Sequence, residues 1–392
     1  MISKVTIKNY KSVVDVNLPL GRFNLLIGAN GCGKSNILEG IAMGAAASSD
    51  KLDYEYFANR GMRVVEPRFM LPAFDEINEE KIMIEVTGEK GDISSFNLHF
   101  NKDSKPAKWE DDSVSFYKLV SHLKNASHKE DGASVSELEQ VLKDLVKERG
   151  DNFVLNIKVG SREKGLTIMS PNPGLEQFLI YSLEESKLRG ADNSNRTFPM
   201  GRHGEGLFAY LKELSQKPEG AYIFDEIKEN LKVLDWFDDM EVPSGQLSME
   251  FNIKLKDSYL DETINSFDQR STNEGFLYLL FYLTLLISDE TPKFFAIENI
   301  DTAFNPKLCR EVTRRLIELA RKHDKQIIAT THNAAVLDGM NIFEDDDVRL
   351  HVVRRSIDGY TKSNRVTLKS EMSMPLSEAW VKGFIGGLPD NF

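Results

Sequence analysis

The stretch that decides the fold is Gly28-Ala29-Asn30-Gly31-Cys32-Gly33-Lys34-Ser35. It fits the pattern G-x-x-x-x-G-K-[ST] without a mismatch. Glycines in such a loop let the backbone curve around a phosphate with its N–H groups turned inward, and the helix that follows adds the positive end of its dipole. The lysine then reaches the β- and γ-phosphates, and the serine hydroxyl reaches Mg²⁺. The motif therefore predicts a nucleotide-binding loop, or P-loop.

The residues on either side of the P-loop have the patterns of a strand and a helix. Phe23–Ile27 is a short apolar run that ends directly at the first glycine, as a buried strand does. Residues 34–47 are rich in alanine, leucine and isoleucine and predict a helix. Alternating or apolar patterns predict further strands at residues 3–8, 13–20, 81–89 and 95–100.

From residue 271 onward the chain predicts alternating helices and strands. A helix is followed by the apolar strand Phe294–Ile297, a helix over 307–323 and a strand over 326–331. Strands separated by helices imply a parallel sheet. We therefore expect an α/β fold with a mixed or parallel sheet and flanking helices, formed by residues 1–100 and 266–392. The middle part, residues 101–265, would be an inserted helical and β subdomain, with a helical pattern over 112–150.

Composition excludes several classes of protein. The chain has 392 residues, of which 41% are apolar, and a formal net charge of −12, so we expect an ordinary globular protein without a uniformly basic nucleic-acid coat. Two cysteines, Cys32 and Cys309, do not make a disulfide framework and suit a reducing cytosol. The longest apolar run, Phe276–Ile287, is too short to span a bilayer, and the N-terminus lacks a signal peptide's apolar stretch. A soluble cytoplasmic protein is expected.

Two strand ends in the second half carry residues that suit a nucleotide site. Glu298 follows Phe294–Ile297, and a P-loop needs an acid at a second strand end to hold Mg²⁺. His332 follows the strand that ends at Thr331, and at the carboxyl edge of a parallel sheet it would face the nucleotide. Ser35 and Glu298 are therefore the predicted Mg²⁺ ligands.

The order of these motifs resembles that of ABC-type ATPase heads. More narrowly, it resembles the RecF/SMC/OLD-like group, in particular the stand-alone AAA family ATPases of bacterial antiviral defence operons. Ile7–Ser12 is similar to the group's N-terminal motif, in which the basic residue, here Lys11, helps to hold nucleotide. Asn273–Leu277 lies where the group has a Ser-x-Gly signature, and Glu298–Pro306 lies where it has Asp-Glu-Pro-Glu-x-x-Leu-His-Pro.

The resemblance implies a head-to-tail homodimer that traps two ATP molecules. Each signature motif would cap the γ-phosphate held by the other subunit, and ATP would close the dimer until hydrolysis releases it. The implied catalytic residues are Glu298, Asn299 and His332. The implied nucleotide-binding residues are Lys11, Asn30, Gly31, Cys32, Gly33, Lys34, Ser35, Asn36, Asn273 and Gly275.

Three positions depart from the group's pattern. Glu298 stands where the group has the Mg²⁺ aspartate, Asn299 where it has the catalytic glutamate, and Asn273 where it has the signature serine. An amide orients a water but does not take its proton, and a general base contributes about 10²–10⁴-fold to a rate. We therefore expect slow hydrolysis. Asp301 is either a substitute base or an acid of an inter-subunit turn.

Three functions fit this sequence. The first is an ATP-gated dimeric switch that controls a separate effector, expected to be a nuclease, in antiphage defence, because 60 residues after His332 are too few for a nuclease domain of its own. The second is a RecF-like DNA-repair clamp. The third is a scaffold that binds ATP without hydrolysing it. Nucleic-acid contact and a solvated surface are both open for the basic residues Arg202, His203, Arg349, Arg354 and Arg355.

Overall fold

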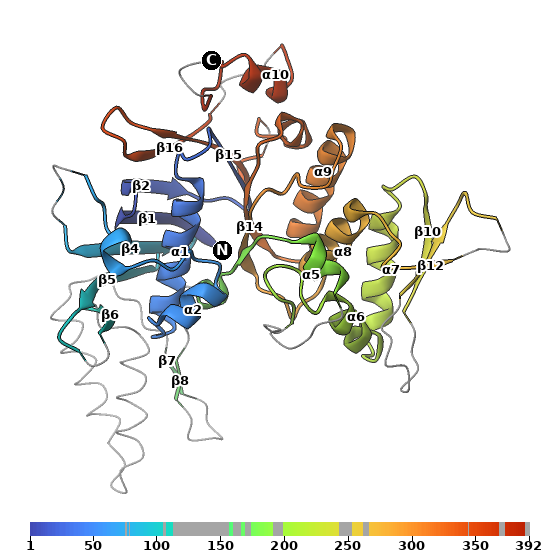
Figure 1. The fold of residues 1–392 in the computed structure, drawn as a ribbon, viewed down its shortest axis with the longest axis horizontal. Coiled ribbons are helices and arrows are strands. Elements are labelled where there is room, and N and C mark those ends of the chain that lie inside the picture. Colours follow the sequence, from blue (N-terminus) through green and yellow to red (C-terminus); the bar gives the residue numbers. More distant parts are fainter. Residues whose placement is uncertain are drawn as a thin grey trace, which may run out of the picture. The chain divides into compact units, whose positions relative to one another are not determined.

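The computed structural model describes residues 1–74, 77, 79–104, 107–112, 157–159, 166–168, 174–190, 199–242, 253–261, 266–343, 345–367 and 373–388 (Figure 1). The helix predicted over 112–150 lies outside these residues. The chain divides into two compact units. The first consists of Met1–Leu20, Gly31–Phe178 and Arg354–Asn364, and the second of Gly21–Asn30, Leu179–Val353 and Arg365–Phe392. The boundaries expected near residues 100 and 265 stay a prediction.

The first unit contains an antiparallel sheet with the strand order β2-β1-β4-β5-β6. Apolar side chains alternate with polar ones along its strands, and the apolar ones are buried, as the sequence pattern predicts. The strands are β1 (Ile2–Tyr10), β2 (Val13–Pro19), β4 (Lys81–Gly88), β5 (Ile93–Asn101) and β6 (Lys108–Asp111). A two-stranded ribbon, β7 (Ile157–Val159) and β8 (Leu166–Ile168), also belongs to this unit.

Helix α1 (Lys34–Ser48) packs on this sheet through two glycines. A Cβ atom on Gly40 would lie 2.9 Å from Cδ1 of Ile7, and one on Gly44 would lie 2.8 Å from Cγ2 of Ile84. The missing side chains therefore let the helix backbone approach β1 and β4 closely. Among its described residues, the unit also contains the short helices α2 (Tyr54–Asn59), η1 (Pro67–Phe69) and η2 (Leu175–Gln177).

The second unit contains a parallel sheet with the order β15-β3-β14-β13-β9. Because these strands run in the same direction, their carboxyl ends meet at one edge of the sheet. β3 and β13 are buried along their whole length; β13 is a continuous apolar run, and β3 is apolar except for Asn24, whose Nδ2 donates to Gly21 O and Ile327 O. The strands are β3 (Phe23–Ile27), β9 (Ile180–Tyr181), β13 (Phe294–Ile297), β14 (Gln326–Thr330) and β15 (Val348–Arg355). After β15, a turn closed by a hydrogen bond from Ser356 N to Tyr360 O leads into β16 (Thr361–Arg365).

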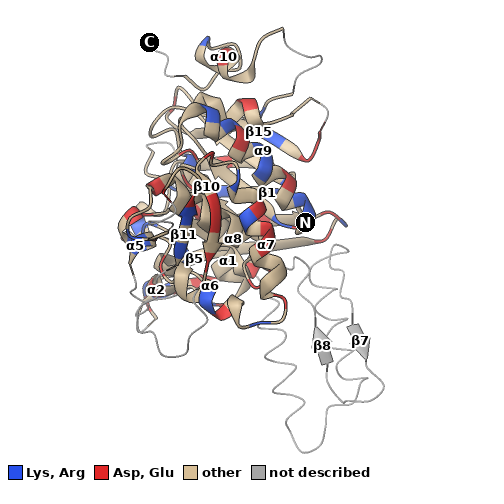
Figure 2. Cartoon of the chain, turned by 90° about the vertical axis from the view of Figure 1, so that its right-hand side faces the viewer, with Lys and Arg blue, Asp and Glu red and all other residues tan. Residues whose placement is uncertain are grey.

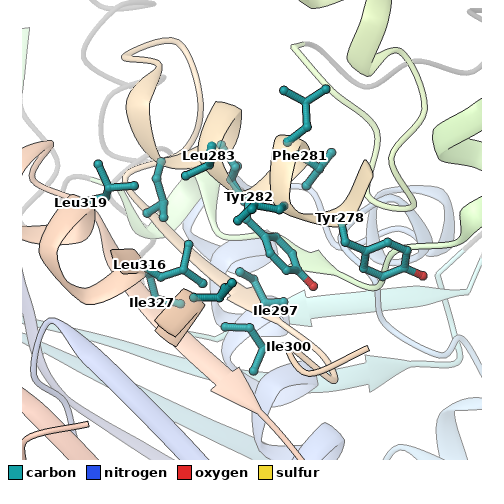
Figure 3. Packing of buried hydrophobic residues seen from close by; sticks show 14 of the residues in the cluster. Tyr278, Phe281, Tyr282, Leu283, Ile297, Ile300, Leu316, Leu319 and Ile327 are labelled. Atoms are coloured by element: carbon teal, nitrogen blue, oxygen red, sulfur yellow. The ribbon is translucent and has the colours of Figure 1, made fainter. Parts of the chain in front are cut away.

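Two helices contribute a large part of the core beside this sheet. In α8 (Glu274–Ile287) every residue from Gly275 onward is buried, and the helix confirms the one predicted after residue 271. In α9 (Pro306–Lys322) one apolar stripe is buried and the other face is charged. Figure 3 shows buried residues of this cluster, among them Tyr282 and Leu283 of α8, Leu316 of α9 and Ile327 of β14.

The second unit has further described elements around this core. They are α5 (Glu185–Arg189), α6 (Leu207–Ser215), α7 (Gly220–Leu231), η4 (Ala334–Gly339), α10 (Leu376–Val381) and a three-stranded antiparallel sheet of β10 (Phe237–Glu241), β11 (Lys254–Asp257) and β12 (Phe267–Asp268). Figure 2 shows acidic residues on β10 and basic residues on β11, where Lys256 Nζ lies 2.9 Å from Glu241 Oε1. Within the described part of the chain, no helix combines the length and the hydropathy needed to cross a membrane.

Candidate functional site

The loop after β3 has the backbone that phosphate binding requires. Gly28, Gly31 and Gly33 have φ angles of 151°, 74° and 109°, which side chains with a Cβ rarely adopt. Helix α1 begins directly at Lys34, and no side chain caps its N-terminus. The first amides of the helix therefore face the loop, where an anion is their natural partner. Gly28–Asn30 belong to the second unit and Gly31–Ser35 to the first.

The side chains of this loop fit a nucleotide phosphate. A Cβ on Gly31 would meet nothing within 4 Å, so the loop is open on that side. Lys34 is buried, with its Nζ 3.9 Å from Cys32 Sγ, and Ser35 is half-buried at the start of the helix. An ammonium, a hydroxyl and a row of backbone N–H groups are the donors that a Mg²⁺-bound phosphate needs. When bound, ATP with Mg²⁺ would supply the phosphoryl group and the metal's positive charge at this loop.

Lys11 lies beside α1 in an ionic cluster around the buried Glu39, which the sequence reasoning missed. Its Nζ donates to Oε2 of Glu39, a carboxylate of α1 with a side-chain exposure of 2%. Tyr10 OH donates to the same oxygen over 3.1 Å, and Arg63 Nε donates to Oε1 over 2.5 Å. Burial lowers the pKa of Lys11, and the charge of Glu39 opposes that shift. Burial, together with Glu39, raises the pKa of Tyr10.

Asn36, also predicted to bind nucleotide, links this cluster to the start of the chain. Its Oδ1 accepts a hydrogen bond of 2.8 Å from Arg63 Nη2. Its Nδ2 donates to Ser12 Oγ over 2.7 Å. Both ends of the Asn36 amide are therefore bonded to protein side chains, and Asn36 holds neighbouring elements of the first unit together.

In the second unit, Glu298 lies at the carboxyl edge of the parallel sheet. It follows β13 directly, and its N–H donates to Tyr181 O of β9 over 2.8 Å. Its side chain is half-buried. Asn299 is exposed and has a φ of 52°, a left-handed conformation that asparagine tolerates better than most residues. Asn299 N donates to Thr330 Oγ1 over 2.9 Å, which fixes the turn after β13 against the end of β14.

The end of β14 carries His332 at the same edge. His332 is exposed, and Thr331 before it is buried. Thr331 Oγ1 donates to Asp301 Oδ1 over 2.6 Å and accepts a bond of 3.0 Å from Asn333 N. Since β3, β13 and β14 are parallel neighbours, Gly28, Glu298 and His332 follow the carboxyl ends of adjacent strands, as the sequence predicts.

Asn273 and Gly275 lie at the N-terminus of α8, in the second unit. Asn273 is exposed and is the N-cap of the helix, where its Oδ1 accepts a bond of 2.9 Å from Phe276 N. Asparagine before an apolar helix is an N-cap signal that the sequence reasoning did not use. A Cβ on Gly275 would lie 3.0 Å from Ala303 O, so this glycine lets α8 approach the turn after β13.

The predicted Mg²⁺ ligands are a hydroxyl and a single carboxylate. Among the described residues, no three His, Cys, Asp or Glu side chains form a group able to hold a metal ion. Mg²⁺ in nucleotide sites is bound by one or two protein oxygens together with phosphates and waters. Ser35 in the first unit has a hydroxyl and Glu298 in the second unit has a carboxylate, which are ligand types that Mg²⁺ accepts.

Most of the basic residues considered for nucleic-acid contact have partners within the protein. Arg349 Nη2 lies 3.1 Å from Asp346 Oδ2, and Arg355 Nε donates to Gly31 O over 3.0 Å. His203 Nδ1 lies 2.7 Å from Ser182 O. Burial lowers the pKa of Arg202, and the charges of nearby carboxylates, Glu298 among them, oppose the shift.

Two family models match this chain. A family model described as "AAA ATPase domain" matches residues 1–274, and one described as "AAA domain, putative AbiEii toxin, Type IV TA system" matches residues 247–338. None of the curated proteins matches the chain.

Two solved structures share the fold. One is an SMC head bound to the C-winged helix domain of ScpA, with 15% identity and a TM-score of 0.54 over 95% of this chain and 99% of that one. The other is an Smc head domain with an extended coiled coil bound to the C-terminal domain of ScpA derived from Pyrococcus furiosus, with 12% identity and a TM-score of 0.53 over 94% of this chain and 96% of that one. This likeness confirms the expected fold, that of an ABC-type ATPase head.

Proposed function

Because the chain belongs to the AAA ATPase domain family, we propose that it binds ATP with Mg²⁺ at Gly28–Ser35 and hydrolyses it slowly. The backbone of that loop is the observation that carries the proposal. Three glycines with positive φ precede a helix whose N-terminus has no side-chain cap. Lys34 and Ser35 complete the donors for the phosphates and the metal.

Slow turnover follows from the residues at the edge of the parallel sheet. Asn299 occupies the position of the family's catalytic glutamate, and its amide does not accept a proton from water at neutral pH. The Asp301 carboxylate accepts a hydrogen bond from Thr331. That contact favours a structural role for Asp301 in the turn after β13 over the role of a substitute base.

We further propose that ATP closes a homodimer of this chain. Asn273 is exposed, as a residue that acts on a nucleotide held by a second subunit must be. Contacts that exist only with a γ-phosphate present would favour the closed dimer, and hydrolysis would reverse that preference.

The dimer would control a separate effector, a nuclease in antiphage defence. The description of the second matching family names a putative toxin of a type IV toxin–antitoxin system. That description supports a role for this chain in a two-component defence system. The internal partners of Arg349 and Arg355 make the alternative, direct clamping of DNA, the weaker proposal.

A scaffold that keeps ATP without hydrolysing it is the second candidate, and Asn299 is the observation that favours it. Phosphate release by the wild type and by Lys34→Ala separates the two functions. Turnover above that of Lys34→Ala supports the ATPase, and equal rates with intact ATP binding support the scaffold. Light scattering with and without ATP tests dimer closure, and a mass that does not change on ATP addition would contradict it.

A further inference from the structure

Two carbonyl groups of the P-loop are held by the hairpin that β15 and β16 form, more than 300 residues away in sequence. Arg355 Nε donates to Gly31 O over 3.0 Å. Thr361 Oγ1 donates to Cys32 O over 3.0 Å. All four residues belong to the first unit. No sequence motif, and none of the comparisons, assigns a role to Arg355 or Thr361.

These two bonds determine where the neighbouring N–H groups point. In a trans peptide the carbonyl and the N–H of the next residue point in opposite directions. Because the Gly31 and Cys32 carbonyls face the hairpin, the amides of Cys32 and Gly33 face away from it. These are amides of the segment in which a P-loop presents N–H groups to phosphate. The hairpin therefore holds the loop in the orientation that phosphate binding uses.

The Thr361 hydroxyl is itself fixed by a chain of hydrogen bonds. Asn36 Nδ2 donates to Ser12 Oγ over 2.7 Å, and Ser12 Oγ lies 2.7 Å from Thr361 Oγ1. Since the only hydroxyl hydrogen of Thr361 goes to Cys32 O, Ser12 is the donor to Thr361. Thr361 is fully buried, and its N–H donates to Ser12 O over 2.8 Å.

Packing adds to this fit. A Cβ on Gly33 would lie 2.0 Å from Thr361 Oγ1, so the threonine side chain lies directly against the last glycine of the motif. The space that the Thr361 side chain occupies is therefore available only because residue 33 has no side chain. Hydrogen bonding and shape both connect the hairpin to the same peptides.

We propose that Thr361 and Arg355 are positioning residues for triphosphate recognition, which orient the Cys32 and Gly33 amides by holding the carbonyls behind them. This inference rests on the proposed ATP-binding function. Neither side chain needs to touch the nucleotide. Their contribution is to keep the loop preorganised, so that binding does not have to order it.

The test compares equilibrium dissociation constants for ATP in matched variants. Thr361→Val keeps the volume and removes the hydroxyl, whereas Thr361→Ser keeps the hydroxyl. We expect Thr361→Val to raise the Kd about tenfold, the equivalent of one lost hydrogen bond, and Thr361→Ser to restore most of the affinity. Arg355→Ala should also weaken binding. Arg354→Ala, which removes the same charge from the adjacent exposed position, should not.

Thermal unfolding without nucleotide accompanies each measurement, so that a general loss of stability is separated from a loss of affinity. Wild-type affinity in both Thr361→Val and Arg355→Ala overturns the inference while leaving the proposed function standing. Equal losses in Arg355→Ala and Arg354→Ala, or no rescue by Thr361→Ser, also overturn it. A wild-type protein that does not bind ATP overturns the proposed function and the inference together.

Discussion

Replacing Asn299 with glutamate tests the proposed reason for slow hydrolysis. If Asn299 occupies the position of the catalytic base, Asn299→Glu supplies the missing carboxylate. A positioned general base contributes about 10²–10⁴-fold, or about 3–5 kcal/mol of the activation free energy. We therefore expect turnover at saturating ATP and Mg²⁺ to rise by at least about 100-fold.

The structure sets the cost of this substitution. Asn299 has a φ of 52°, and most side chains other than glycine, asparagine and aspartate lose about 1–2 kcal/mol in that conformation. Its side chain is exposed, so a longer one has room. The hydrogen bond to Thr330 Oγ1 is donated by the backbone N–H of residue 299, so glutamate at this position retains it. The cost is small beside a typical free energy of unfolding of about 5–15 kcal/mol.

Asn299→Gln is the matched control. It has the same length and the same left-handed strain as Asn299→Glu but lacks the carboxylate. Steady-state phosphate release by both variants, corrected for the rate of Lys34→Ala, isolates the effect of the base. If both variants bind ATP and Asn299→Glu is no faster than Asn299→Gln, then Asn299 is not at the catalytic position and our reasoning about that strand end is wrong.

Three further predictions concern other parts of the molecule. Gly33→Ala should abolish ATP binding measured by titration calorimetry, because its Cβ would lie 2.0 Å from Thr361 Oγ1 and φ is 109°; retained affinity would contradict the loop geometry. Asn273→Trp should block ATP-induced dimerisation in light scattering while ATP binding persists, because residue 273 is exposed at the start of α8; dimers that still form would contradict the signature assignment. Burial lowers the pKa of Lys325 from 10.5 to about 7. Between pH 7 and pH 10.5, Lys325 is therefore protonated in the unfolded chain and neutral in the folded one. The free energy of unfolding of the wild type should then rise, relative to that of Lys325→Met, as the pH rises from 7 toward 10. Urea unfolding should show a rise of at most about 1.4 kcal/mol per pH unit. Parallel stability curves would show that Lys325 does not titrate in this way.

Much of the sheet edge was predictable because its signals are local. An apolar run that ends at a glycine or an acid marks a buried strand and its carboxyl end, as in Phe23–Ile27 and Phe294–Ile297. Short elements gave no such signal. Helix α2 has six residues and β9 has two, too few for a hydrophobic period to appear. They form because neighbouring parts of the fold bind them.

The roles of individual polar residues were harder to predict, because their partners come from elsewhere in the chain. Glu39 is an acidic residue of α1 whose sequence position suggests exposure to solvent. Its side chain is instead buried and bonded to Tyr10, Lys11 and Arg63. A buried carboxylate is stable only when it is paired, and those pairs depend on tertiary structure. Asn36 lies next to the motif and is predicted to contact nucleotide, and its side-chain amide bonds to Arg63 and Ser12, partners that the sequence does not indicate.

The P-loop also combines a local sequence signal with partners from a distant part of the chain. The motif contains the groups that meet the phosphates, and its glycines allow a conformation that they do not enforce, since glycine adopts many others. Something outside the motif must therefore select the binding conformation. In this chain Arg355 and Thr361 bond to two consecutive carbonyls of the loop, and Thr361 packs against Gly33. A P-loop motif transplanted without such a hairpin would have the right donors but would have to order them each time it binds, at a cost in affinity.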